Sequence, residues 1–157
     1  MEIDREHRSP NHKARTQKPT LIVIHASAGR SDMGDVSWIC SPQSGVSYHY
    51  LVGRDGTVYE LVGPSRQAWH AGKSEWRGVP HCNAYSIGVA WSNRHDGVEP
   101  LTGAQLKAMR ELLDWLAEQY PTLTEVVTHA DVSPGRKTDP EGCPTFYKPD
   151  WCGPLKG

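Results

Sequence analysis

A strand–helix–strand pattern in the second half of the chain constrains the fold more than any other feature. Residues 85–91 and 124–128 are rich in β-branched and aromatic residues, which is typical of strands. Between them, Thr102 and Gln105 have the spacing of a capping box, and Tyr120 precedes a proline that marks the end of the predicted helix. The apolar residues that recur at helical spacing are Leu106, Met109, Leu112, Leu113 and Leu116. Because such crossovers are right-handed and join parallel strands, segments 85–91 and 124–128 are expected to run parallel.

The first half of the chain adds a buried strand and a hairpin. Residues 20–24 form a short continuous apolar run, as expected of a strand covered on both faces. The dipeptide Asp55-Gly56 separates two β-rich runs, 47–52 and 57–62, and this is a strong hairpin signal because Gly supplies a positive φ. With 157 residues in total, the elements predict one α/β domain over residues 19–157, with a central mixed β-sheet flanked by helices.

Two long loops are expected to lie near the ends of these strands. Residues 28–46 are predicted as a loop with one helical turn at Trp38-Ile39, and residues 63–84 as a second loop. In the first hairpin strand, alternation places Tyr48 and Tyr50 on one face and His49 on the other, so we interpret His49 as structural.

The ends and the overall composition exclude several classes of protein. Residues 1–18 are polar and charged and are predicted to be a poorly ordered arm. The net charge of −1 gives no case for nucleic acid as a partner. No apolar run approaches the roughly 20 residues of a membrane helix, and no secretory signal is visible, so we expect a cytoplasmic monomer without a membrane anchor. The four cysteines, which have no CxxC spacing, are expected to be free thiols.

Two histidines follow predicted strands directly, and they suggest a metal site. His25 follows the apolar run 20–24, and His129 follows strand 124–128. Ligands in open α/β sheets bind outside the carboxyl ends of strands, so these imidazoles are expected to meet there. A loop carboxylate, Asp139, is the candidate third ligand, and Cys143 a little further along is its rival. Two histidines and one carboxylate would form a zinc site with an open fourth position.

Five motifs that occur in order carry a resemblance to a known family: His25 after an apolar strand, Ser47-Tyr48-His49-Tyr50 with Asp55-Gly56, Ala68-Trp69-His70-Ala71-Gly72, Asn83 with Ser86-Ile87-Gly88, and His129 through Pro140. Over roughly residues 20–150 the chain resembles the zinc-dependent N-acetylmuramoyl-L-alanine amidases, the family that includes phage endolysins, anhydromuropeptide amidases and peptidoglycan-recognition proteins. Each motif alone is weak, but their order is specific. The resemblance implies the fold of this family, a Zn²⁺ cofactor and a peptidoglycan or muropeptide substrate.

The resemblance also implies roles for individual residues. His25, His129 and Asp139 match the three zinc ligands, although Cys143 matches members in which a cysteine is the third ligand. Lys137 and Tyr48 match residues with catalytic roles. Trp69 and His70 match the loop beside the substrate, and Trp69 and Trp76 are both candidate platforms for sugar or peptide.

One departure affects the expected function. Anhydromuropeptide amidases carry a glutamate shortly after the Ser-Ile-Gly strand, whereas Ala90 and Trp91 stand here, which leaves the general base unassigned. This departure favours a phage endolysin that reaches the cell wall through a holin pore and lyses the host. The alternatives are a cytoplasmic anhydromuropeptide-recycling amidase, a non-catalytic peptidoglycan-binding module and a protein with a structural zinc.

Overall fold

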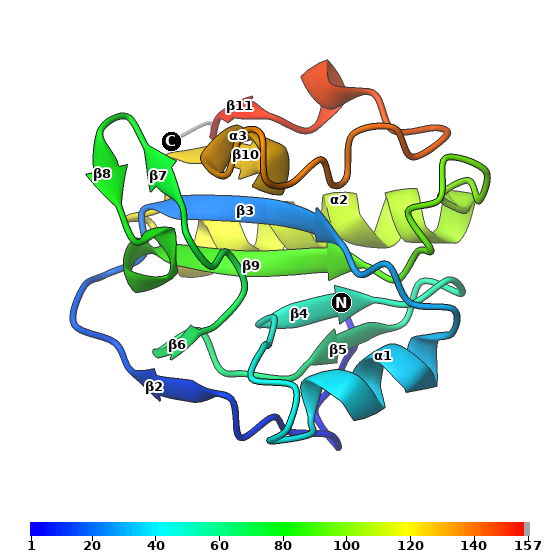
Figure 1. Ribbon diagram of the computed structural model, residues 1–157, viewed down its shortest axis with the longest axis horizontal. Helices are drawn as coiled ribbons and strands as arrows, with labels where there is room; N and C mark the ends of the chain where they lie inside the picture. Colours follow the sequence, from blue (N-terminus) through cyan, green and yellow to red (C-terminus); the bar gives the residue numbers. More distant parts are fainter. Residues whose placement is uncertain (156–157) are drawn as a thin grey trace.

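A seven-stranded mixed sheet forms the centre of the protein (Figure 1), in a computed structural model that describes residues 1–155. Its strands in spatial order are β1 (Ile3–Asp4), β5 (Val58–Glu60), β4 (Tyr50–Val52), β9 (Ser86–Trp91), β3 (Leu21–Ala26), β10 (Glu125–Thr128) and β11 (Gly153–Pro154). Strands β4, β9, β3 and β10 run parallel, while β5 and β11 run antiparallel to β4 and β10. The predicted single α/β domain with a mixed sheet is therefore confirmed, and β9 and β10 are parallel through β3, which lies between them.

Helix α2 (Gly103–Gln119) covers one face of the sheet. It begins as predicted, with Thr102 as N-cap and a capping box with Gln105, and it ends at the C-cap Tyr120. Its apolar side packs against side chains of alternate strand positions and forms the main core: Ile22, Ile24, Tyr50, Val52, Ile87, Val89, Trp91, Met109, Leu112, Leu113 and Leu116. Burial of a side chain of this size stabilises the fold by about 1.5–3 kcal/mol each.

The opposite face is covered by α1 (Asp32–Ile39), where the sequence predicted only one helical turn. Ser31 caps α1 by accepting a hydrogen bond from the backbone N–H of Gly34, and Val36 and Ile39 pack on Leu51 and Ala90 of the sheet. The remaining elements on the loops are β6 (Arg66–Ala68), β7 (Glu75–Trp76), β8 (Val79–Pro80), the 3₁₀ segment η1 (Cys82–Tyr85), α3 (His129–Val132) and η2 (Lys148–Asp150).

The amino-terminal segment corrects the prediction of a poorly ordered arm. β1 pairs with β5 in the main sheet, and β2 (His12–Ala14) pairs with β6 in a small second sheet. Asn11 is buried, and its side-chain amide donates to the carbonyls of Ile39 and Val46. The pattern was not visible in the sequence because these strands are only two or three residues long, and because polar side chains, rather than an apolar stripe, attach the segment to the domain.

The hairpin of β4 and β5 forms at Asp55-Gly56 as predicted, but the expected alternation fails at its start. Tyr50 lies in the core under α2, whereas Tyr48 packs on the opposite face. The regular ladder begins only at Tyr50, because the carbonyl of His49 accepts from the backbone N–H groups of both Leu61 and Val62, so the period of two does not extend to Tyr48. His49 is structural, as predicted, and its buried ring accepts from the N–H of Gly88.

Two further expectations concern the cysteines and membranes. All four cysteines lie among the described residues and are free thiols, as predicted. Within residues 1–155, no helix has the length and apolar character needed to cross a membrane.

Candidate metal centre and its cleft

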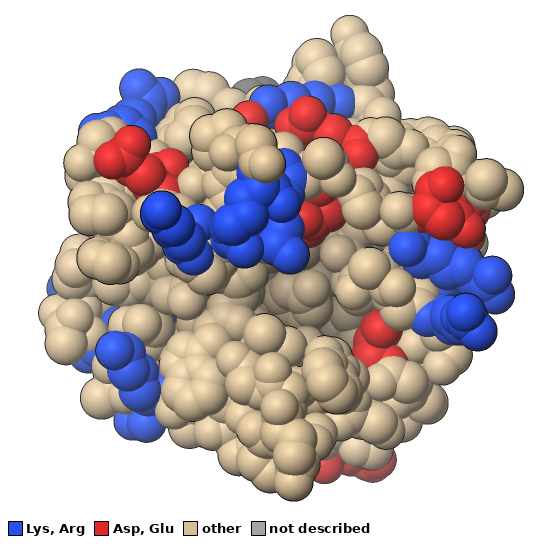
Figure 2. Space-filling view, in the orientation of Figure 1, with Lys and Arg blue, Asp and Glu red and all other residues tan. Residues whose placement is uncertain are grey.

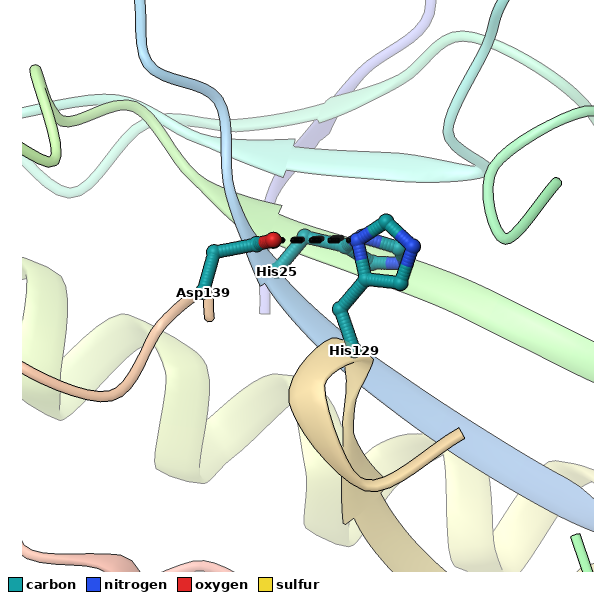
Figure 3. A group of neighbouring side chains, drawn as sticks. All are labelled: His25, His129 and Asp139. Atoms are coloured by element: carbon teal, nitrogen blue, oxygen red, sulfur yellow. Dashed lines mark hydrogen bonds and ion pairs between the residues drawn. The ribbon is translucent and has the colours of Figure 1, made fainter. Parts of the chain in front are cut away.

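His25, His129 and Asp139 converge at the carboxyl end of the central strands (Figure 3). His25 belongs to β3, while His129 begins α3 directly after β10, whose Thr128 pairs in register with Ile24. The two Nδ1 atoms are 3.0 Å apart, and Nδ1 of His129 is 3.0 Å from Oδ1 of Asp139. The three ligand atoms all lie within 4.8 Å of one another, so the residues predicted as ligands form a single group.

A chain of hydrogen bonds fixes which ring nitrogen of His25 carries its proton. The hydroxyl of Ser86 donates to the carbonyl of Cys82 at 2.6 Å, so this hydroxyl accepts from Nε2–H of His70 at 2.9 Å. Nδ1 of His70 is then an acceptor, and it receives the Nε2–H of His25 at 2.9 Å. The Nδ1 lone pair of His25 is therefore directed towards Asp139 and His129.

His129 is oriented in the same way by a backbone group. Its Nε2 lies 3.2 Å from the carbonyl of Ala71, which can only accept, so Nε2–H donates to this carbonyl and Nδ1 faces His25 and Asp139. The two Nδ1 atoms are 3.0 Å apart, a spacing that suits two ligand atoms directed at one cation. Two imidazoles and a carboxylate, each hydrogen-bonded from behind, are a donor set that suits Zn²⁺.

The protonation states also fit a metal site. Burial lowers the pKa of His25 to about 4, so its ring is neutral at neutral pH. Burial opposes ionisation of Asp139, but the adjacent imidazoles of His129 and His25 outweigh burial and hold the pKa of this carboxyl well below its usual value. The backbone N–H of Ala26 also donates to Asp139, at 3.2 Å.

The rival third ligand, Cys143, lies outside this group. Its Sγ is 3.5 Å from Nδ1 of His95 and 3.6 Å from Oδ1 of Asn93, and the residue belongs to the core cluster under α2. Burial raises the pKa of the Cys143 thiol to about 11, which is opposite to the shift expected of a thiolate ligand. The geometry therefore supports Asp139 as the ligand.

The metal group lies in a cleft of about 510 Å³ whose walls differ in chemistry. Arg136 and Lys137 line one side, and Trp38 and Val46, both exposed, line the other. Figure 2 shows the hollow near the centre of this face, with a group of Lys and Arg side chains along its upper border. A cationic wall opposite an apolar one suits a substrate that has both an acidic and an apolar part.

The other residues predicted for the site, Tyr48, Lys137, Trp69 and His70, all line the cleft but make different contacts. Tyr48 lines the cleft with its ring centroid 5.0 Å from that of His25, and burial raises the pKa of its hydroxyl, which is therefore a neutral donor. Lys137 and Trp69 also line the cleft. His70 also borders the cleft, but it is buried and accepts a hydrogen bond from His25, a position that supports this candidate ligand.

Trp76 is not part of the cleft, which corrects its interpretation as a sugar platform. Its Nε1–H donates to Glu125 at 2.8 Å, and its side chain packs in a separate cluster. Among the lining residues that sequence reasoning did not name as site residues are Asp35, Trp38 and His95. The signal for the first two was weak because α1 has no clear apolar stripe that would have predicted a helix here.

A mixed α/β sheet with a buried His-His-Asp group at the carboxyl ends of its parallel strands, beside an open cleft, is the arrangement expected of a metal-dependent hydrolase. Residues 15–142 match the family model described as N-acetylmuramoyl-L-alanine amidase, and the chain belongs to this family. The enzyme is thus a Zn²⁺-dependent N-acetylmuramoyl-L-alanine amidase, whose substrates derive from peptidoglycan.

Several curated relatives are 1,6-anhydro-N-acetylmuramyl-L-alanine amidases. The 1,6-anhydro-N-acetylmuramyl-L-alanine amidase AmpD of Enterobacter cloacae is 33% identical over 164 residues, which cover 91% of this chain and 83% of that protein. The match to AmpD of Haemophilus influenzae is 37% identical over 100 residues, and it spans 62% of this chain but only about half (53%) of that protein.

Solved structures show the same fold. A crystal structure of an AmpD derivative has a TM-score of 0.78 at 28% identity and covers 92% of this chain and 89% of that one. AmiD from E. coli, in complex with anhydro-N-acetylmuramic acid-L-Ala-D-γ-Glu-L-Lys, has a TM-score of 0.67 at 31% identity and covers 82% of this chain and 55% of that one. The Ph2119 endolysin of a Thermus scotoductus bacteriophage has a TM-score of 0.61, with 87% of this chain and 94% of that one covered, but at 22% identity it supports the fold alone.

Proposed function

We propose that this amidase acts on soluble anhydromuropeptides in the cytoplasm, and that it releases the stem peptide by hydrolysis of the amide between N-acetylmuramic acid and L-alanine. The observation that carries the proposal is the likeness to the AmpD of Enterobacter cloacae across 91% of the chain, which includes all three residues of the metal group. The sequence prediction of a phage endolysin receives no comparable support, because the endolysin cited above is only 22% identical. The departure at Ala90 therefore does not identify an endolysin.

The residues of the cleft fit amide hydrolysis. His25, His129 and Asp139 would hold Zn²⁺, which in such sites acts as a Lewis acid and supplies an activated water at neutral pH. Lys137, whose ammonium group lies on the wall of the cleft, would stabilise the negative charge that develops on the scissile carbonyl oxygen. Tyr48, as a neutral hydroxyl, would donate a hydrogen bond to the same oxygen, and Trp69 would contact the substrate beside it.

The size of the cleft also supports a small substrate. A volume of about 510 Å³ lies within the range of roughly 300–1,000 Å³ that is usual for small-molecule sites. The apolar wall at Trp38 and Val46 suits a sugar ring, and the cationic wall suits the carboxylates of a stem peptide. Retention of all three ligands argues against a non-catalytic binding module, and an open cleft beside the metal group argues against a structural zinc.

A comparison of three substrates tests this proposal. The zinc-loaded protein would be given a soluble anhydromuramoyl tripeptide, the corresponding muramoyl tripeptide without the anhydro ring, and intact peptidoglycan sacculi. We expect the highest kcat/KM for the soluble anhydro substrate and slow release of peptide from sacculi, with a His129→Ala protein as the inactive control. Faster hydrolysis of sacculi than of either soluble substrate would support the endolysin instead.

A further inference from the structure

Asp35 is a carboxylate of the cleft that does not belong to the metal group. It lies on α1, and its Oδ2 accepts hydrogen bonds of 2.5 Å from the hydroxyls of Ser27 and Ser92. Ser27 comes two residues after His25, directly after the end of β3, which corresponds to roughly 7 Å of extended chain. The carboxylate therefore lies at the ends of β3 and β9 and lines the same cleft as His129 and Asp139.

The sheet next to His25 offers no acid or base of its own. Ala90 of β9 pairs in register with His25, so the two side chains share a face of the sheet. Val36 and Ile39 of α1 belong to the same buried cluster as Ala90, so this helix covers the position on the sheet. The helix that closes this position also carries Asp35, one residue before Val36, to the wall of the cleft.

The other titratable groups of the cleft are less suited to accept a proton from water. The Tyr48 hydroxyl has a raised pKa and remains protonated, and Lys137 carries an ammonium group. His95 lies on the lining, but its ring nitrogens are engaged, Nε2 at 3.0 Å from Thr138 and Nδ1 at 3.5 Å from Cys143. The Asp139 carboxylate belongs to the metal group, with its oxygens within 3.5 Å of Nδ1 of both histidines.

The environment of Asp35 suits proton transfer. Burial raises the pKa of its carboxyl above the ordinary value, with a further small increase from Asp32, although the hydroxyls of Ser27 and Ser92 and the charge of Arg54 act in the opposite direction. Oδ1 lies over Gly29, where a Cβ atom would be only 1.6 Å away. Glycine at this position therefore leaves room for the carboxylate to stay at the wall of the cleft.

We propose that Asp35 is the general base and acid of the amidase reaction. As the C–O bond forms between the attacking water and the scissile carbonyl carbon, the carboxylate of Asp35 takes a proton from that water. When the C–N bond breaks, the protonated Asp35 returns this proton to the leaving nitrogen. One water is consumed, and the products are the lactyl carboxyl group and the free α-amine of L-alanine. The proposal rests on the proposed function only for the choice of substrate.

The test compares Asp35→Asn with Asp114→Asn, which makes the same change of charge at an exposed position of α2. Wild-type turnover of each soluble substrate is measured first, so that an unsuitable substrate is not mistaken for a failure of Asp35. We expect Asp35→Asn to bind zinc as tightly as the wild type, to keep its KM, and to lose kcat by about 10²–10⁴-fold. Asp114→Asn should match the wild type.

Two further variants separate catalysis from a structural role. Asp35→Ala assayed with added formate should recover part of its kcat, because the small carboxylate can replace the missing group, while formate should not accelerate the wild type. Ser92→Ala removes one hydrogen bond to Asp35 but keeps the carboxylate, and it should retain most activity. The proposal is wrong if Asp35→Asn keeps kcat within about threefold of the wild type. It is also wrong if Ser92→Ala loses as much kcat as Asp35→Asn and formate restores no activity to Asp35→Ala, because Asp35 would then only join the strand ends.

Discussion

Nε2 of His25 and Nδ1 of His70 lie 2.9 Å apart on the side of the imidazole away from Asp139. This contact makes the buried His70 a support for a metal ligand, and it is the last of three hydrogen bonds that run from the carbonyl of Cys82 through Ser86 and His70 to the site. The orientation of His25 therefore depends on residues that do not touch the metal.

A methyl group at Gly88 should disturb this support. A Cβ atom built there would lie 2.4 Å from Cγ of His70, so Gly88→Ala must displace the ring. We expect zinc affinity, measured by competition with a chromophoric chelator, to fall by about 10–100-fold, as for other residues behind metal ligands. Gly103→Ala is the control, because a Cβ at Gly103 meets nothing within 4 Å. Equal zinc affinity in both variants would contradict this role of His70.

Removal of the metal should abolish activity. We expect EDTA to eliminate hydrolysis and a stoichiometric addition of Zn²⁺ to restore it. Asp139→Ala should lose most zinc by elemental analysis, since its carboxylate is 3.0 Å from Nδ1 of His129, whereas Cys143→Ser should keep a full equivalent. Retention of zinc in Asp139→Ala together with its loss in Cys143→Ser would reverse the assignment of the third ligand.

Loss of the Lys137 charge should reduce catalysis without loss of metal. Lys137 is exposed on the wall of the cleft, two residues before Asp139, so Lys137→Gln should fold and bind zinc normally. We expect kcat to fall by about 10²–10³-fold, the usual cost of removing a donor that stabilises developing negative charge. Lys107→Gln, at an exposed position of α2, should retain full activity. Wild-type turnover by Lys137→Gln would exclude the lysine from the mechanism.

His49 should make the fold less stable in acid. Burial lowers the pKa of its ring to about 3, whereas the unfolded chain has the ordinary value of about 6.5, so between these values the unfolded state binds one more proton. The stability due to neutral His49 is therefore full above about pH 6.5 and is lost as pH falls towards 3, by about 1.4 kcal/mol per pH unit.

A neutral replacement provides the check on this pH dependence. His49→Gln keeps a donor for the carbonyl of Arg66 and an acceptor for the N–H of Gly88, but it does not titrate. Urea unfolding of both proteins at pH 7 and pH 5, in EDTA to remove the effect of metal, should show a smaller loss for the variant. The same loss in both proteins would mean that other groups set the acid dependence.

Strong local signals explain which parts of the fold were predictable. The capping box at Thr102, the apolar stripe of α2 and the Asp-Gly turn each record a local interaction in the sequence, and all three are present. The histidines after two apolar strands predicted the metal group because neighbouring parallel strands end at the same edge of the sheet. The prediction of residues 1–18 failed because Asn11 and Arg8 are held by long-range polar contacts, to Ile39 and Glu60, which leave no periodic pattern.

The cleft was only partly predictable for a similar reason. Asp35 and Trp38 reach it because α1 packs over Ala90, a contact between distant segments that no local pattern records. Trp76 lies between two of the motifs that carry the family resemblance, yet its position is decided by a hydrogen bond to Glu125 on another strand. The departure at Ala90 was visible in the sequence, but only the packing of α1 on the sheet indicates which carboxylate could replace the missing one.

The wide separation in sequence of the three residues of the metal group has a consequence for the synthesis of the enzyme. His25 lies on β3, but the other two residues of the metal group are residues 129 and 139, which follow β10 in the sequence. A nascent chain therefore carries no complete His-His-Asp group until residue 139 has been added. Fragments that stop before residue 139 should be inert, even where the central strands are present.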